Sequence, residues 1–408
     1  MTNIERPAWL ASLPSYWNVA PGKTMTKLIQ RPASEGDGIV TAFRDGKVTL
    51  RANRRMDGFT EAIQEIGYQG VRAGELVIHS MDGFAGAIGV SDSDGKMSPV
   101  VHIYRTPDDD PYYIAHTLRV AAQAGFIQSL AKGIRERSTS FDKASFKSML
   151  LPRPPRAEQG EIVAYIDRET AQIDTLIADQ QRLIEMLRER RQAMIDHAFG
   201  SFSEKGIQLR RFIRFLTSGS RGWGEYYADS GDVFVRIGNL PRGSLSLRGE
   251  VQRVDLPPNV YEGQRARLKV GDLLFSITAY IGSVAVADQE WADSYVSQHV
   301  ALCRIDMSVL DPKFTGYFML TTKGQNQLSG GALGGTKVQL ALDDIKALRV
   351  PVPSLNEQQQ IVERLAQETS RIDNLIAESE RLIELSQERR SALITAAVTG
   401  QIDVRQEA

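Results

Sequence analysis

The sequence of 408 residues has almost no cysteine and no long apolar run. Cys303 is the single cysteine, so the chain cannot form an internal disulfide, and we expect Cys303 to fill a core. No stretch of roughly 18 apolar residues occurs, so a membrane-spanning helix is not expected. The start, MTNIERPAWLASLPSYW, lacks the basic-then-apolar pattern of a signal peptide. These absences predict a protein of the reducing cytoplasm.

A large excess of one charge sign is also missing, because the formal net charge is −1. Basic and acidic residues number 18 and 16 in residues 1–150, and 7 and 9 in 151–200. They number 18 and 15 in 201–349, and 6 and 10 in 350–408. No segment is therefore a basic tail for nucleic acid, although a locally basic face on the first and third segments stays possible.

The sequence does not contain the common catalytic or metal-binding motifs. GGALGGTK (330–337) lacks the G-K-[ST] order of a phosphate loop, and PPNVY (257–261) lacks the order of an N-P-P-Y methyltransferase motif. PDDDP (107–111) is not followed by a nuclease-type Asp/Glu-x-Lys, so it predicts a solvated acidic loop. The histidines are scattered and show no zinc-binding spacing. We expect no catalytic, cofactor or metal site in this chain.

An internal repeat decides the architecture. Residues 151–200 match residues 350–399 at 23 of 50 positions when the two are aligned at an offset of 199. Each copy begins with a proline-spaced segment, LPRPP or VPVPS, that favours extended chain. Ser354 and Glu357 then form a capping-box pattern. About forty residues follow with Gly160 as the only helix breaker, which predicts two helices of roughly 60 Å.

The apolar residues of these helices recur with a period of eleven, or about 3.67 residues per turn, which predicts nearly straight helix packing. Leu176, Leu183 and Leu187 widen the stripe. An ordinary bundle helix would explain one such stripe, but not the duplication of the whole unit. The residues predicted to pack are Ile162, Ile166, Ile173, Ile177, Ile184, Ile195, Ile361, Leu365, Ile372, Ile376, Ile383 and Ile394.

The two segments outside the helices share one distant similarity. RAGELVIHSMDGFAGAIGV (72–90) and KVGDLLFSITAYIGSVAV (269–286) both predict a strand, a glycine-bearing turn and another strand. The residues before these stretches differ strongly. The sequence therefore predicts an α+β protein with two globular heads, which two long antiparallel helices separate, and a pseudo-two-fold internal repeat.

Residue types suited to DNA gather in both heads. FRDGKVTLRANRR (43–55) predicts a hairpin with alternating cations, and the second head mixes arginines with aromatic residues in a glycine-rich loop. Arginine and asparagine can pair with base edges, while lysine mainly contacts phosphates. For each residue, a solvated charge on a strand is the alternative. The candidates are Arg44, Lys47, Arg51, Arg54, Arg55, Arg221, Trp223, Tyr227, Arg236, Asn239, Arg242 and Lys337.

The chain resembles the specificity (S) subunits of type I restriction-modification systems. VPVPSLNEQQQIVERL (350–365), LPRPPRAEQGEIVAYI (151–166), both ID-x-LIA segments and GGTKVQLALDDIKALRVPVP (334–353) carry the resemblance. It implies a first target recognition domain at 1–150, a linker and spacer helix at 151–200, a second recognition domain at 201–349, and a second linker and helix at 350–408. Each recognition domain is then expected to read one half of a bipartite DNA sequence.

The resemblance also implies partners. The paired helices are expected to bind two modification (M) subunits, and restriction (R) subunits then join. S-adenosylmethionine, ATP and Mg belong to those partners, so no cofactor is expected in this chain and the chain is not an enzyme by itself. Two other classes stay open: a scaffold that joins proteins without DNA, and an enzyme acting on DNA, against which the missing motifs count.

Overall fold

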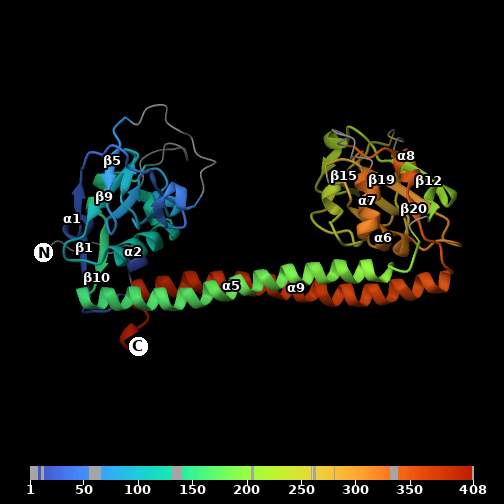
Figure 1. Cartoon of the computed structure of the whole chain (residues 1–408). Coiled ribbons are helices and arrows are strands. Elements are labelled where there is room, and N and C mark those ends of the chain that lie inside the picture. The colour runs from blue at the N-terminus through green and yellow to red at the C-terminus, as the bar shows by residue number, and fades with distance from the viewer. Residues whose placement is uncertain are drawn as a thin grey trace. The chain divides into compact units, whose positions relative to one another are not determined.

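The computed structural model describes residues 8–10, 13–54, 66–130, 140–203, 206–258, 260, 263–279, 281–330 and 339–406. The chain divides into two compact units. Unit 1 comprises residues 1–179 and 382–408, and unit 2 comprises residues 180–381. Each unit joins one strand-rich head to a segment of each of two long helices (Figure 1).

The two predicted long helices are present. Helix α5 spans Arg156–Ala198 and helix α9 spans Leu355–Val398, or 43 and 44 residues. At ~1.5 Å per residue these lengths are about 65 Å each. The Ser354 hydroxyl accepts a hydrogen bond from the Glu357 N–H at 3.3 Å, so the serine caps α9 as its sequence predicts.

Segments of α5 and α9 pack together within each unit. In unit 1, Asp174 of α5 pairs with Arg390 of α9 at 3.1 Å. In unit 2, Arg191 of α5 pairs with Asp373 of α9 at 3.2 Å. Of the predicted packing residues, Ile162, Ile166, Ile173, Ile184, Ile195, Leu365, Ile372 and Ile394 are buried. The others, Ile177, Ile361, Ile376 and Ile383, are partly buried.

Each head contains a four-stranded antiparallel sheet, and the strands of the two sheets follow one another in the corresponding order. The sheet of unit 1 runs β2 (Lys27–Ile29), β9 (Val101–Arg105), β6 (Leu76–His79) and β7 (Ile88–Val90). The sheet of unit 2 runs β12 (Ile213–Ser218), β19 (Val300–Ile305), β16 (Leu273–Ser276) and β17 (Val284–Val286). The β6–β7 and β16–β17 pairs are the strand–turn–strand elements that the sequence predicts.

A helix follows the sheet in each head and ties it to a long helix. Helix α2 (Pro111–Gln123) is capped by Asp110, and α6 (Pro312–Leu320) is capped by Asp311. The Gln159 carboxamide of α5 accepts the Asp110 N–H at 2.7 Å. The Gln358 carboxamide of α9 accepts the Asp311 N–H, also at 2.7 Å. The glutamine of each E-Q pair therefore anchors a head helix.

Smaller elements complete the heads. The linkers before the long helices are strands: β10 (Leu150–Arg153) pairs with β1 (Asn18–Pro21), and β20 (Arg349–Val350) pairs with β11 (Ile207–Gln208). The remaining strands are β3 (Val40–Ala42), β4 (Val48–Leu50), β5 (Gln69–Val71), β8 (Gly95–Met97), β13 (Tyr227–Ala228), β14 (Asp232–Val235), β15 (Gln252–Val254) and β18 (Tyr295–Val296). The short helices are α1 (Gly22–Met25), α3 (Phe126–Leu130), α4 (Lys143–Ser148), α7 (Thr322–Gly330) and α8 (Leu342–Ala347).

Two sequence predictions about individual residues have different outcomes. Cys303 is buried in β19, and burial raises the pKa of its thiol to about 12, so its role as core filling is confirmed. The prediction that PDDDP is wholly solvated was wrong, because Asp109 is 2% exposed and accepts two 2.9 Å hydrogen bonds from Arg153. A buried carboxylate needs such a partner. Among the described residues, no helix is long and apolar enough to cross a membrane.

Candidate nucleic-acid interface

A hairpin is present in the first head, but its strands are Val40–Ala42 and Val48–Leu50, so the prediction of cations alternating along strands of 43–55 was wrong: Arg51 and Arg54 lie after the second strand. Strands β3 and β4 pair antiparallel, and the Gly46 N–H donates to the Phe43 carbonyl at 2.9 Å in the turn. Gly46 has φ of +89°, and a Cβ there would lie 2.4 Å from Arg119 Nη1. Asp45 Oδ1 accepts the Lys47 N–H at 3.1 Å, which is the local bond that favours Asp in turns. The D-G sequence therefore shapes this turn.

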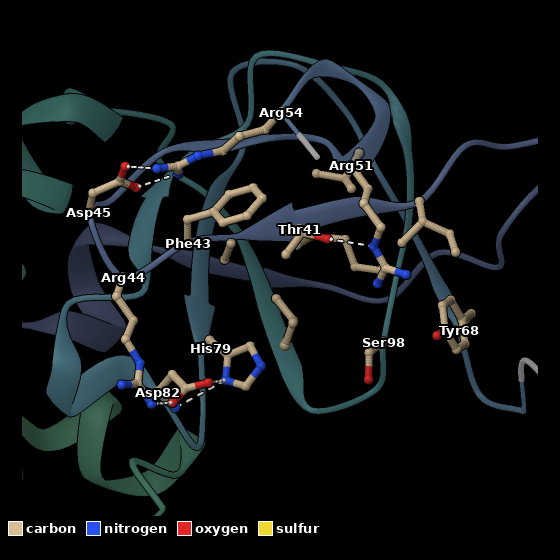
Figure 2. Close-up of a pocket in the computed structure, with 15 residues that line it drawn as sticks. Thr41, Phe43, Arg44, Asp45, Arg51, Arg54, Tyr68, His79, Asp82 and Ser98 are labelled. Atoms are coloured by element: carbon tan, nitrogen blue, oxygen red, sulfur yellow. Dashed lines mark hydrogen bonds and ion pairs between the residues drawn. The ribbon is translucent and has the colours of Figure 1, made fainter. Parts of the chain in front are cut away.

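A cavity of about 550 Å³ lies beside the hairpin (Figure 2). Its walls come from β3, the turn, the start of η2 (Arg51–Asn53), β6 and the segment after β8. Its lining residues are Ile39, Val40, Thr41, Ala42, Phe43, Arg44, Asp45, Arg51, Arg54, Tyr68, His79, Asp82, Met97, Ser98 and Val101. Apolar walls with a few polar or charged groups are usual for a binding cavity, and here three arginines are among those groups.

Arg54 is held in place on one side of this cavity. Its Nη2 lies 2.6 Å from Asp45 Oδ2 and its Nη1 lies 3.0 Å from Asp45 Oδ1, while its Cζ lies 4.3 Å from the centre of the Phe43 ring (Figure 2). Burial acts to raise the pKa of Asp45, but hydrogen bonds from Arg54 and the Lys47 N–H outweigh it and lower the pKa. The carboxylate is therefore ionised at neutral pH and orients the guanidinium.

Arg44 is ordered by a second carboxylate. Arg44 Nη2 donates to Asp82 Oδ1 at 2.8 Å, and the Asp82 N–H donates to His79 Nδ1 at 3.0 Å (Figure 2). Burial lowers the pKa of His79, and the Arg44 charge lowers it further against the opposing Asp82 charge. An imidazole nitrogen that accepts a backbone N–H carries no proton, so His79 is neutral at pH 7.

These contacts leave the cavity with arginines in fixed directions. Arg51 Nε lies 3.5 Å from Thr41 Oγ1, and Lys47 is exposed beside the turn. A guanidinium that is already oriented loses less side-chain entropy when it binds. Arginine pairs bidentately with the O6 and N7 of guanine, or with phosphate oxygens. The first head therefore presents Arg44, Arg51 and Arg54 together at this cavity.

The second head has a smaller exposed group of the same chemistry. The Tyr227 side chain is 45% exposed, and Arg236 Cζ lies 6.0 Å from the centre of its ring. Arg221 is exposed in the turn before η6 (Trp223–Tyr226). An exposed aromatic ring beside an arginine can stack on a base or a sugar while the cation contacts a phosphate.

Two predicted contact residues lie inside the second head. Trp223 is 3% exposed and packs against Phe234 and Tyr295 with ring centroids 5.5 and 5.0 Å away. Asn239 is 2% exposed; its Oδ1 accepts the Arg236 N–H, and its Nδ2 donates to the carbonyls of Arg248 and Glu250. Both therefore support the loops, and we do not include them in the interface.

The remaining predicted contact residues lie away from these two groups or outside the described residues. Arg242 is exposed and lines a separate cavity beside α5. Arg55 and Lys337 lie outside the described residues. The carboxylates Asp45 and Asp82 were missed by sequence reasoning, although the D-G turn that contains Asp45 was a usable signal. No cluster of three or more metal-ligating side chains occurs in the described part of the chain.

The long helices carry exposed apolar residues, and two of them, Leu176 and Leu183, belong to the apolar stripe that was predicted to pack. Leu176 and Leu183 are 39% and 37% exposed, whereas Leu187 is buried at 7%. Met186 is 52% exposed on the same side of α5, since residues three and seven apart share a face. Leu375, Leu382 and Leu385 of α9 occupy the positions 199 residues later and are 48%, 39% and 51% exposed. Each helix therefore presents one row of exposed apolar side chains.

Comparison with known proteins identifies the relatives of this chain. Residues 261–385 match the type I restriction modification DNA specificity domain. The putative type I restriction enzyme MjaX specificity subunit of Methanocaldococcus jannaschii is 23% identical over 307 residues, or 72% of this chain and 69% of the relative. The EcoKI specificity subunit of Escherichia coli K12 is 23% identical over 397 residues, or 87% and 82%. The predicted resemblance is therefore confirmed.

Solved structures share the fold. One solved structure has a TM-score of 0.69 at 16% identity. Its description reads "Structural basis underlying complex assembly and conformational transition of the type I R-M system". The superposition covers 96% of this chain and 99% of the chain in that structure. The HsdS subunit of Thermoanaerobacter tengcongensis has a TM-score of 0.54 at 17% identity and covers 96% and 98%.

Proposed function

We propose that this chain is the DNA sequence-specificity subunit of a type I restriction-modification complex and reads a bipartite DNA target. The observation that carries the proposal is the match of residues 261–385 to the DNA specificity domain, within a chain similar to specificity subunits along most of its length. The first recognition domain comprises residues 1–150 and the second comprises residues 201–349. Each reads one half-site.

The helical segments 151–200 and 350–408 act as the spacer between the recognition domains, and the chain is an internal repeat with pseudo-two-fold symmetry. The support comes from contacts that recur at an offset of 199. Asp174 with Arg390 in unit 1 corresponds to Asp373 with Arg191 in unit 2. Gln159 and Gln358 each bind the N-cap backbone of a head helix.

The exposed apolar rows on α5 and α9 bind the two modification subunits. Rows of the same residues on two repeated helices suit two copies of one partner. Exposed apolar side chains at helical spacing are also the usual anchors for a partner helix. Restriction subunits join this complex, and S-adenosylmethionine, ATP and Mg are bound by the partners. This chain is the non-catalytic specificity component.

Base reading falls to the ordered arginines. In the first head, Arg44, Arg51 and Arg54 project beside a cavity of about 550 Å³. In the second head, Arg236 lies beside the exposed Tyr227 ring, and Arg221 is exposed in the turn before η6. The two heads present different residues, so the two half-sites differ in sequence.

The test is a map of methylated adenines in DNA from cells that express this chain with its neighbouring modification subunit. Cells with either protein alone are the controls. A bipartite motif that requires both proteins is expected. Absence of any motif, with the complex assembled, would favour the alternative of a scaffold that joins proteins without DNA.

Exchange of residues 201–349 for another head of this kind tests the spacer role. One half of the methylated motif should change, and the number of base pairs between the halves should not. A changed spacing would show that the helices do not set the distance.

A further inference from the structure

A second cavity lies within unit 2 between α5, α9 and the head. Its volume is about 730 Å³, and its polar lining includes Arg188 and Arg191 from α5, and Arg242 and Arg248 from a head loop. Asp373 and Glu380 from α9 are its acidic residues. Four arginines against two carboxylates give the cavity a net positive charge, which is the charge of a site for anions.

The cavity is built around Arg191. The Arg191 side chain is 12% exposed, and its Nε lies 3.2 Å from Asp373 Oδ1. Gly243 has φ of +75°, and a Cβ there would lie 3.3 Å from Arg191 Nη1, so the head loop packs directly on the guanidinium. Arg188, 63% exposed, pairs with Glu380 at 3.4 Å. The helix thus contributes an ordered arginine, and the loop contributes exposed ones.

The loop that supplies Arg242 and Arg248 is tied to the proposed DNA-reading residues. Asn239, at the end of η7 (Ile237–Asn239), accepts the Arg236 N–H and donates to the Arg248 carbonyl. The backbone at Arg248 is therefore fixed beside Arg236. Arg236 and a loop that lines the positively charged cavity are therefore joined through the same buried side chain.

Unit 1 has a related cavity at the corresponding positions of α9. It measures about 210 Å³ and is lined by His116, Arg119 and Gln123 of α2 with Gln387, Arg390 and Ser391 of α9. Arg390 is the counterpart of Arg191 at the offset of 199. Burial lowers the pKa of the Arg119 guanidinium, and the positive charge of Arg390 lowers it further. Both arginines line this cavity. Arg119 also contacts the turn of the recognition hairpin at Gly46.

We propose that the cavity beside α5 in unit 2 binds a phosphodiester of the DNA backbone next to the half-site that the second head reads. This inference rests on the proposed function. Arginine forks match the geometry of phosphate oxygens, and contacts to phosphate carry no base preference. The cavity therefore adds affinity and fixes the register of the head on DNA, while the loop residues select the bases.

The experiment compares two double variants of equal charge in the complex assembled with the modification subunit. Arg242→Gln with Arg248→Gln removes the exposed arginines of the cavity. Arg210→Gln with Arg265→Gln is the control, because both residues are exposed in the same head and lie outside the cavity. Binding is measured between 50 and 200 mM salt to a duplex that carries the methylated motif and to one that lacks it.

The salt dependence gives the expected result. Each lost phosphate contact reduces the slope of log affinity against log salt by about 0.9, so two contacts amount to roughly a twelvefold difference over this salt range. The cavity variant should show this smaller salt effect on both duplexes, and its methylated motif should stay unchanged.

Three other results have distinct meanings. A cavity variant with the salt slope of the control would overturn the proposal. A loss of the modification subunit from the complex would also overturn it, because the cavity would then bind an acidic side chain of that partner. Failure of the wild-type complex to prefer the motif-bearing duplex would instead overturn the proposed function.

Discussion

Gln358 is the residue whose replacement most directly tests how a head is attached to its long helix. Its side chain is fully buried, and all its hydrogen-bond partners are backbone atoms. Gln358 Oε1 accepts the Asp311 N–H at 2.7 Å, and Nε2 donates to the Val309 and Pro353 carbonyls, both at 2.9 Å. The carboxamide thus links α9, its preceding linker and the start of α6.

Gln358→Ala removes all three bonds at once. At about 1 kcal/mol per bond, the loss is about 3 kcal/mol, and more if the buried backbone groups stay unpaired. Every 1.4 kcal/mol is about a factor of ten, so local opening at the start of α6 should become roughly a hundredfold more frequent. Hydrogen exchange of the Thr315 amide, which bonds the Asp311 carbonyl in the first turn of α6, measures this opening.

The neighbouring residue provides a matched control. Gln359 is exposed on the same turn, so Gln359→Ala deletes the same atoms without breaking these contacts. Equal exchange rates at the Thr315 amide in the two variants would refute the reasoning. A rise confined to Gln358→Ala would show that this carboxamide holds the head helix in place.

Three further predictions follow from particular side chains. Arg54→Ala should weaken binding to one half-site by on the order of 10- to 100-fold and leave the other unchanged, as measured with duplexes mutated in either half. Leu183→Glu with Leu382→Glu should abolish co-purification of the modification subunit without changing the circular dichroism spectrum. Burial lowers the pKa of His102 and of His116 to about 4. As the pH drops from about 6.5 toward 4, these histidines therefore bind protons in the unfolded chain before they do so in the folded chain, which lowers the free energy of unfolding. The midpoint of urea unfolding should fall over this pH range.

The long helices could be predicted from the sequence because their cause is local. An uninterrupted run of helix formers with period-eleven isoleucines needs no knowledge of the rest of the fold, and α5 and α9 follow that run. The direction of the apolar row was not predictable in the same way. Leu183 and Leu187 both extend the stripe, but only the position of the second helix decides that Leu187 is buried and Leu183 exposed.

The candidate interface shows the same limit. The D-G turn predicts the β3–β4 hairpin and places Arg44 at its tip, because turn geometry depends on nearby residues. Trp223 and Asn239 have the composition of contact residues, yet they are buried because Phe234, Tyr295 and the Arg248 backbone surround them. Pairing with Asp45 and Asp82 likewise depends on tertiary structure, and it decides how the arginines point.

The attachment of head to helix explains how two heads can diverge on a repeated frame. The three hydrogen bonds described above for the Gln358 side chain all go to backbone atoms of its head and linker, and any sequence with the same backbone can supply these atoms. Gln159 binds the Asp110 N–H and the Pro154 carbonyl in the same manner, and its third bond goes to the Asp109 carboxylate in place of a backbone carbonyl. A head exchanged at residues 201–349 can therefore keep these three bonds if it supplies a correctly placed helix start. The loops that differ between heads lie outside these contacts, so their sequences can change without loss of the attachment.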